Sequence, residues 1–169
     1  IMSKKISIAI DAMGGENSPT KIIKGIEIHS LSTKDVFYNI FGDQKQIEPL
    51  IKKTKISNNS YKIIHTKNII EDSDSPLSAA KKGKDTSMWL SIESLKNNES
   101  DVAISAGNTG ALFVISKLNL KMIENIDKPA LSALWPNKKS FNVVLDLGAN
   151  IECSDKNLVD FSIMGSSLF

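Results

Sequence analysis

Apolar residues follow two spacings along the chain, and the two alternate. Strands are predicted where apolar residues alternate with polar ones or form short runs, at residues 5–10, 36–41, 61–65, 101–105, 129–135 and 141–147. Helices are predicted where the spacing is three or four, after Pro19, through 50–51, from about 77 to 95, over 111–120 and over 157–168. This alternation predicts an α/β fold with a mostly parallel sheet and helices on both faces.

Three features bear on how the chain is organised. Gly83 and Asp85 interrupt the predicted helix over 77–95 and indicate a break or kink. No repeat or low-complexity linker is visible, so one α/β domain is predicted over residues 1–169. The last predicted helix has an apolar face and ends at Phe169 without a polar tail, which indicates a fragment.

Composition excludes several classes of protein. The chain has 169 residues, of which 41% are apolar and 24% charged, as in a globular domain. No apolar run approaches the roughly 20 residues of a spanning helix, and the first ten residues do not resemble a signal peptide. The one cysteine, Cys153, cannot form an internal disulfide. These features favour the cytoplasm.

The basic residues are all of one type. The count of 21 basic residues consists of lysines alone, so an anion site in this chain must use lysine or backbone N–H groups. The lysines are scattered, which does not indicate nucleic-acid binding. His29 and His65 lack the spacing of metal ligands, and we predict no metal.

Three turns that contain glycine or asparagine follow predicted strands, at residues 11–15, 105–110 and 146–150. In open α/β sheets, ligands bind beyond the carboxyl ends of the strands. If the three preceding strands are parallel, the three turns lie along one rim of the sheet.

The middle turn is the strongest candidate for an anion site. Gly107 and Gly110 let the backbone approach a ligand closely, and the next helix directs its N–H groups and dipole at the turn. Ser105, Asn108 and Thr109 add polar groups. The turn matches neither a Walker A loop nor a dinucleotide fingerprint, and a simple capped strand-to-helix turn is the alternative reading.

Other polar residues allow two readings each. Asp11 and Asp146 fall at strand ends, where either could orient a donor or bind a metal, although aspartate is also common there as a turn residue. Asn17 and Asn150 are ligand donors or turn residues. Lys84 lies with other lysines near a helix start, where it either reaches a phosphate or belongs to a solvated face.

Five pieces of the sequence, taken in order, resemble the bacterial phosphate acyltransferase family of phospholipid synthesis (PlsX). They are IAIDAMGG at 8–15, SAGNTGAL at 105–112, KPAL at 128–131, VLDLGAN at 144–150 and LVDFSIMGS at 158–166. The resemblance extends from Lys5 to the final residue and corresponds to the N-terminal half of family members. The chain departs from the family at Glu16, where aspartate is typical, and over 78–84, which is usually richer in arginine.

This resemblance implies a fold similar to the isocitrate/isopropylmalate dehydrogenase and phosphotransacetylase group, in which two α/β lobes flank a cleft, with the second lobe missing here. It implies conversion of long-chain acyl-acyl carrier protein and inorganic phosphate to acyl phosphate. A glycerol-3-phosphate acyltransferase would act downstream. It also implies a cytoplasmic homodimer with peripheral contact to the inner face of the plasma membrane.

Phosphate is itself the nucleophile in this reaction, so no protein nucleophile and no cofactor is expected. We expect Asn108, Thr109 and Lys84 to act at the reacting groups. The residues expected to bind phosphate or shape its site are Asp11, Gly14, Gly15, Asn17, Ser105, Gly107, Gly110, Asp146, Gly148 and Asn150. Two other functions stay open: a non-catalytic phosphate- or nucleotide-binding module, and an inactive truncated remnant.

Overall fold

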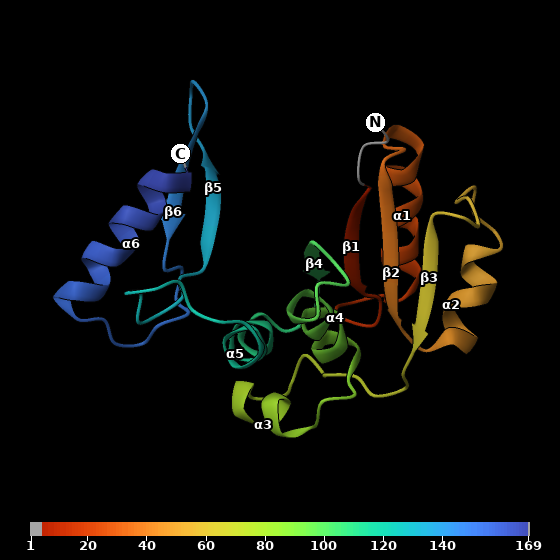
Figure 1. The fold of residues 1–169 in the computed structure, drawn as a ribbon, viewed down its shortest axis with the longest axis horizontal. Coiled ribbons are helices and arrows are strands. Elements are labelled where there is room, and N and C mark those ends of the chain that lie inside the picture. The colour runs from red at the N-terminus through yellow and green to blue at the C-terminus, as the bar shows by residue number, and fades with distance from the viewer. Residues whose placement is uncertain (1–4, 169) are drawn as a thin grey trace. The chain divides into compact units, whose positions relative to one another are not determined.

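The computed structural model describes residues 5–168, and the chain divides into two compact units, Ile1–Leu120 (unit 1) and Lys121–Phe169 (unit 2). Figure 1 shows the elements of both units, which are described separately below. The single domain expected over residues 1–169 stays a prediction. The expected end of the last helix at Phe169 lies outside the described residues.

Unit 1 contains the strands and helices in the order that the sequence predicts. Its strands are β1 (Ile6–Asp11), β2 (Val36–Gly42), β3 (Tyr61–His65) and β4 (Val102–Ser105). Its helices are α1 (Thr20–Ser32), α2 (Gln44–Ile51), α3 (Pro76–Lys81), α4 (Ser87–Lys96) and α5 (Thr109–Asn119).

The four strands form one parallel sheet in the order β3-β2-β1-β4, as the adjacent strands in Figure 1 show. In this register Asp11, the last residue of β1, lies beside Ser105, the last residue of β4. The turns that follow β1 and β4 therefore begin side by side at the carboxyl ends of the strands.

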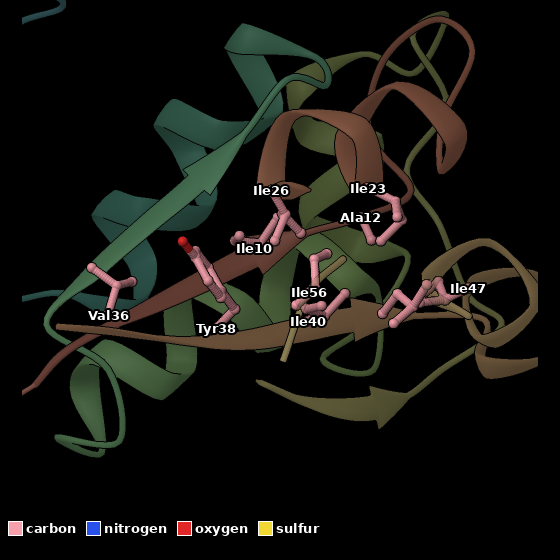
Figure 2. Packing of buried hydrophobic residues seen from close by; sticks show 10 residues of the cluster. Ile10, Ala12, Ile23, Ile26, Val36, Tyr38, Ile40, Ile47 and Ile56 are labelled. Carbon is pink, nitrogen blue, oxygen red and sulfur yellow. The ribbon is translucent and has the colours of Figure 1, made fainter. Parts of the chain in front are cut away.

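Helices cover both faces of this sheet. On one face, β1 and β2 pack against α1 and α2. Figure 2 shows Ile10 of β1 and Ile40 of β2 in one buried cluster with Ile23 and Ile26 of α1. The alternate positions face α4, because Asn39 donates to the Ser100 hydroxyl at 2.7 Å just beyond that helix. The predicted α/β class is confirmed.

The predicted break between residues 77 and 95 is also confirmed. α3 ends at Lys81 and α4 begins at Ser87, and between them Gly83 has a φ of +118°, a region that favours glycine. Thr86 then starts α4, because its hydroxyl accepts the N–H of Trp89 at 3.3 Å.

Unit 2 consists of β5 (Ser132–Pro136), β6 (Phe141–Leu145) and α6 (Asp155–Leu168). β5 and β6 pair antiparallel. The third turn therefore does not follow a parallel strand, which was the condition for placing it on the same rim as the other two turns. The reason is the short connection: the Asn137 side chain accepts the N–H groups of Lys139 and Ser140, each at 2.8 Å, and turns the chain back. A parallel crossover needs about a dozen residues.

Within residues 5–168, the helices are too short or too polar to cross a membrane.

Candidate functional site

The turns after β1 and β4 are in direct contact. A Cβ atom added to Gly14 would lie 2.9 Å from the backbone nitrogen of Gly107 and 2.5 Å from the Asp11 carboxylate. Gly15 has a φ of +86°, and a Cβ there would overlap the carbonyl oxygen of Ala106. Glycine is therefore required at both positions for the two turns to approach this closely.

A chain of hydrogen bonds joins the two turns. Asp11 is 1% exposed, and its carboxylate accepts the Met13 N–H at 3.2 Å and the Ser105 hydroxyl at 2.7 Å. The same hydroxyl oxygen accepts the N–H of Gly107 at 3.1 Å. Asp11 and Ser105 thus fix the course of the backbone that leads into α5.

The side chain of Asn108 also holds the turn between β4 and α5. As the N-cap of α5, its side-chain oxygen accepts the N–H of Ala111 at 2.9 Å. Its side-chain nitrogen donates to the carbonyl oxygens of Asp72 at 3.0 Å and Asp74 at 2.8 Å. Both amide hydrogens are used in these bonds. The side chain thus caps the helix and anchors the 72–74 loop, and its predicted contact with phosphate stays a prediction.

The N-terminus of α5 opens at this turn. The first N–H groups of a helix have no partner within the helix, and the helix dipole places partial positive charge there. Thr109 is exposed at this end. Gly110 packs against the start of α3, since a Cβ on it would lie 2.7 Å from Cγ of Pro76.

The lysines near α3 differ in their surroundings. Lys82 forms an ion pair with Asp74 at 2.5 Å, and this contact holds the pKa of the Asp74 carboxyl below its ordinary value. The pair fastens the same loop that Asn108 anchors. Lys84 is exposed in the connection to α4, and its predicted role at the phosphate stays a prediction.

Asn17 is exposed just before α1 with a φ of +59°, and its carbonyl oxygen accepts the N–H of Lys21 at 3.0 Å. The structure assigns it a place in the helix start. Its predicted role as a ligand donor stays a prediction.

The third turn, in unit 2, is held together by its own side chains. The Asp146 carboxylate accepts the Asn150 side-chain amide at 2.9 Å and the Cys153 thiol at 3.3 Å, and the same amide donates to the carbonyl oxygen of Pro129 at 2.9 Å. The Asn150 hydrogen bond lowers the pKa of Asp146, and burial raises the pKa of the Cys153 thiol. Gly148 lies in the same turn, and a shared site for Asp146, Gly148 and Asn150 with the first two turns stays a prediction.

No group of three His, Cys, Asp or Glu side chains in the described part of the chain is arranged to hold a metal ion.

Comparison with known proteins gives this arrangement its context. A family model described as "fatty acid synthesis protein" matches residues 6–169. The chain belongs to this fatty acid synthesis protein family. The predicted resemblance to the phosphate acyltransferases is confirmed, because similar proteins carry that name.

One such relative is the phosphate acyltransferase of Pelagibacter ubique, which is 68% identical over 99% of this chain and 50% of its own length. Those of Azorhizobium caulinodans (38% identical, 99% of this chain and 47% of the relative) and Rhodospirillum rubrum (40%, 97% and 47%) also match. The chain therefore spans about half the length of these curated relatives.

The family match spans residues of both units and therefore includes every predicted site residue. The predicted homodimer, cytoplasmic location and membrane contact remain predictions.

An apolar groove with a volume of about 300 Å³, which the sequence did not predict, lies beside the two turns, between α1 and the β4 end of the sheet. Two signals in the sequence pointed to it only weakly. Lys21, Gly25 and His29 are spaced four residues apart, so they lie on one side of α1. Ile104 is an apolar residue of β4, which is an end strand of the sheet.

Proposed function

We propose that this chain provides the phosphate-binding part of a phosphate acyltransferase, which transfers a long-chain acyl group from acyl carrier protein to inorganic phosphate. The observation that carries this proposal is the hydrogen-bond chain from Asp11 through Ser105 to Gly107, which fixes the turn at the N-terminus of α5. The names of the relatives support the reaction type.

Phosphate would be held by backbone groups in this site. The N–H groups of Thr109 and Gly110 begin α5, and helix N-termini bind phosphate through such donors and through the helix dipole. Asn108 contributes by fixing the turn, because its side chain is already hydrogen-bonded. Lys84 would supply positive charge in a chain that has no arginine.

The buried Asp11 carboxylate needs a separate explanation, because a negative charge beside an anion site is unfavourable. Two of its lone pairs are occupied by the Met13 N–H and the Ser105 hydroxyl. Its charge therefore orients the Ser105 hydroxyl so that the oxygen lone pair faces Gly107. Asp11 acts as a positioning residue in this proposal.

The reaction requires no protein nucleophile. An oxygen of hydrogenphosphate attacks the thioester carbonyl carbon, the new C–O bond forms, and the C–S bond breaks with its electron pair on sulfur. The phosphate proton ends on the leaving thiolate, so the products are acyl phosphate and the free thiol of acyl carrier protein. Fixed N–H donors stabilise the negative charge on the carbonyl oxygen, and alignment of the two reactants lowers the barrier further.

Acyl-phosphate formation tests this proposal directly. Palmitoyl-acyl carrier protein and phosphate are incubated with the 169-residue chain, and acyl phosphate is trapped with hydroxylamine as the hydroxamate. We expect phosphate-dependent product. Lys84→Ala should raise the KM for phosphate up to about fivefold, whereas Lys53→Ala, which removes an exposed lysine after α2, should leave it unchanged. An equal effect of both variants would remove Lys84 from the site.

Two other functions make different predictions in the same assays. A phosphate- or nucleotide-binding module would bind phosphate or ATP in calorimetry but form no hydroxamate. An inactive remnant would form no product under conditions in which the full-length Pelagibacter ubique relative forms it. Phosphate binding without product by the 169-residue chain, with no heat from acyl carrier protein, would reject the acyltransferase proposal for this chain.

A further inference from the structure

The apolar groove of unit 1 is built from three neighbouring elements. Ile8 and Ile10 of β1 form its floor, α1 forms one wall, and Ile104 of β4 forms the other. β4 is the end strand of this sheet, and Ile104 is 50% exposed there although its register partner Ile10 is buried. The groove therefore leaves open an apolar surface that a ligand could cover.

One end of the groove coincides with the candidate phosphate site. Asp11 and Ala106 line the groove, and both belong to the stretches that carry the paired turns. Lys21, in the first turn of α1, lines the same wall and brings a positive charge. Lys21 thus suits an anionic head at this end of the groove, where the Asp11 carboxylate is already hydrogen-bonded to Met13 and Ser105.

The rest of the wall is apolar and leaves room. Gly25 lines it, and a Cβ added there would meet no atom within 4 Å. His29 lines it one turn further on, and both of its ring nitrogens have partners: Nδ1 lies 2.7 Å from the hydroxyl of Tyr38, and Nε2 lies 3.5 Å from the hydroxyl of Thr33. From Lys21 to His29 is eight residues, or about 12 Å along a helix.

We infer that this groove holds the acyl chain of the substrate, with the carbonyl end at the paired turns. This inference rests on the proposed function, because phosphate at the turns sets the position of the reacting end. Zigzag C–C bonds of about 1.5 Å advance the chain about 1.25 Å each, so 12 Å accommodates about eight to ten carbons. A longer chain would extend beyond His29.

Binding of alkyl phosphates to the 169-residue chain tests the inference. Inorganic phosphate, butyl phosphate and octyl phosphate are titrated by calorimetry below their micellar concentrations. Each methylene that enters the groove should tighten binding up to about fourfold, so octyl phosphate should bind far more tightly than inorganic phosphate.

Gly25→Leu fills the groove and should abolish the gain from butyl to octyl phosphate. The matched control is Ser32→Leu, which adds the same side chain to an exposed position at the end of α1 that does not line the groove. Ile104→Asn is a second test variant on the opposite wall, and it should reduce the gain without adding bulk. Circular dichroism checks that each variant is folded.

The outcomes separate this inference from the proposed function. If inorganic phosphate binds but octyl phosphate binds no more tightly, the groove does not hold the chain and the proposed function stands. An equal gain in Gly25→Leu and Ser32→Leu places the alkyl chain elsewhere and also overturns the inference. If Gly25→Leu instead abolishes a dimer seen by light scattering and leaves the gain intact, a second copy covers the groove. Failure of inorganic phosphate to bind rejects the phosphate site itself.

Discussion

Replacing Gly14 with alanine would insert a methyl group at the closest contact between the two turns. The added Cβ would lie 2.5 Å from an oxygen of Asp11, 2.9 Å from the nitrogen of Gly107 and 3.0 Å from its Cα. None of these atoms can move freely, because Asp11 is buried and hydrogen-bonded and the other two belong to the backbone. The turns must therefore separate or the strands must shift.

Overpacking of this kind costs about 1–3 kcal/mol of unfolding free energy, and contact with backbone on one side favours the upper end. Gly25→Ala is the matched control, since its Cβ meets nothing within 4 Å and alanine in a helix is more favourable than glycine by about 1 kcal/mol. The two variants should thus differ by about 4 kcal/mol, with opposite signs relative to the unchanged protein.

Urea unfolding measures this difference. Trp89 is buried in unit 1 and Trp135 is exposed in unit 2, so a Trp135→Phe background lets the fluorescence of Trp89 report unit 1 alone. Displacement of the Gly107 backbone would also disturb the turn that leads to the Thr109 and Gly110 N–H groups, so Gly14→Ala should weaken phosphate binding about fivefold. If Gly14→Ala is as stable as the unchanged protein and binds phosphate equally well, the argument that close contact of the turns builds the site is wrong.

Three further predictions concern the groups that hold the turns. Ser105→Ala removes a hydrogen bond to a buried carboxylate and should destabilise unit 1 by about 1.5–3 kcal/mol in urea unfolding, with partial rescue by Ser105→Thr; full stability would refute the link to Asp11. Asn108→Ala should lower the free energy of unfolding by about 1–2 kcal/mol. Asn108→Asp loses the donors to the 72–74 loop but keeps the oxygen that caps α5, so it should lower the free energy of unfolding less. Equal losses in the two variants would contradict the capping role. The ion pair with Lys82 lowers the pKa of Asp74, so the stability that it contributes is present above the ordinary pKa of 3.8 and is lost as the pH falls below it through the folded pKa. In Asp74→Asn, the midpoint of urea unfolding should therefore depend less on pH in that range. An unchanged dependence would argue against the ion pair.

Most of the fold of unit 1 follows from patterns that are local in sequence. The alternation of predicted strands and helices predicts a sheet that is covered on both faces, and Gly83 predicts the break between α3 and α4. The partner of a strand is not encoded in its own spacing. β5 and β6 therefore read as strands, but their antiparallel pairing depends on the four-residue turn between them.

The sequence predicted that the first two turns lie together, but not which groups each of their side chains contacts. Glycine-containing turns after parallel strands indicate a rim, and the structure brings Asp11, Gly14, Ser105 and Gly107 together there. The partners of Asn108 are carbonyl oxygens 34 and 36 residues earlier in the chain, which no local pattern reveals. The groove escaped prediction for the same reason, because its walls come from α1 and β4.

The most direct test of the account is a titration of the ¹⁵N-labelled 169-residue chain with inorganic phosphate, followed by the amide shifts in NMR spectra. Binding at the paired turns predicts the largest shifts at residues 107–110, with a saturating dependence on phosphate. Saturable shifts confined to other residues, or no saturable shifts at all, would contradict the claim that backbone amides at the start of α5 bind the phosphate.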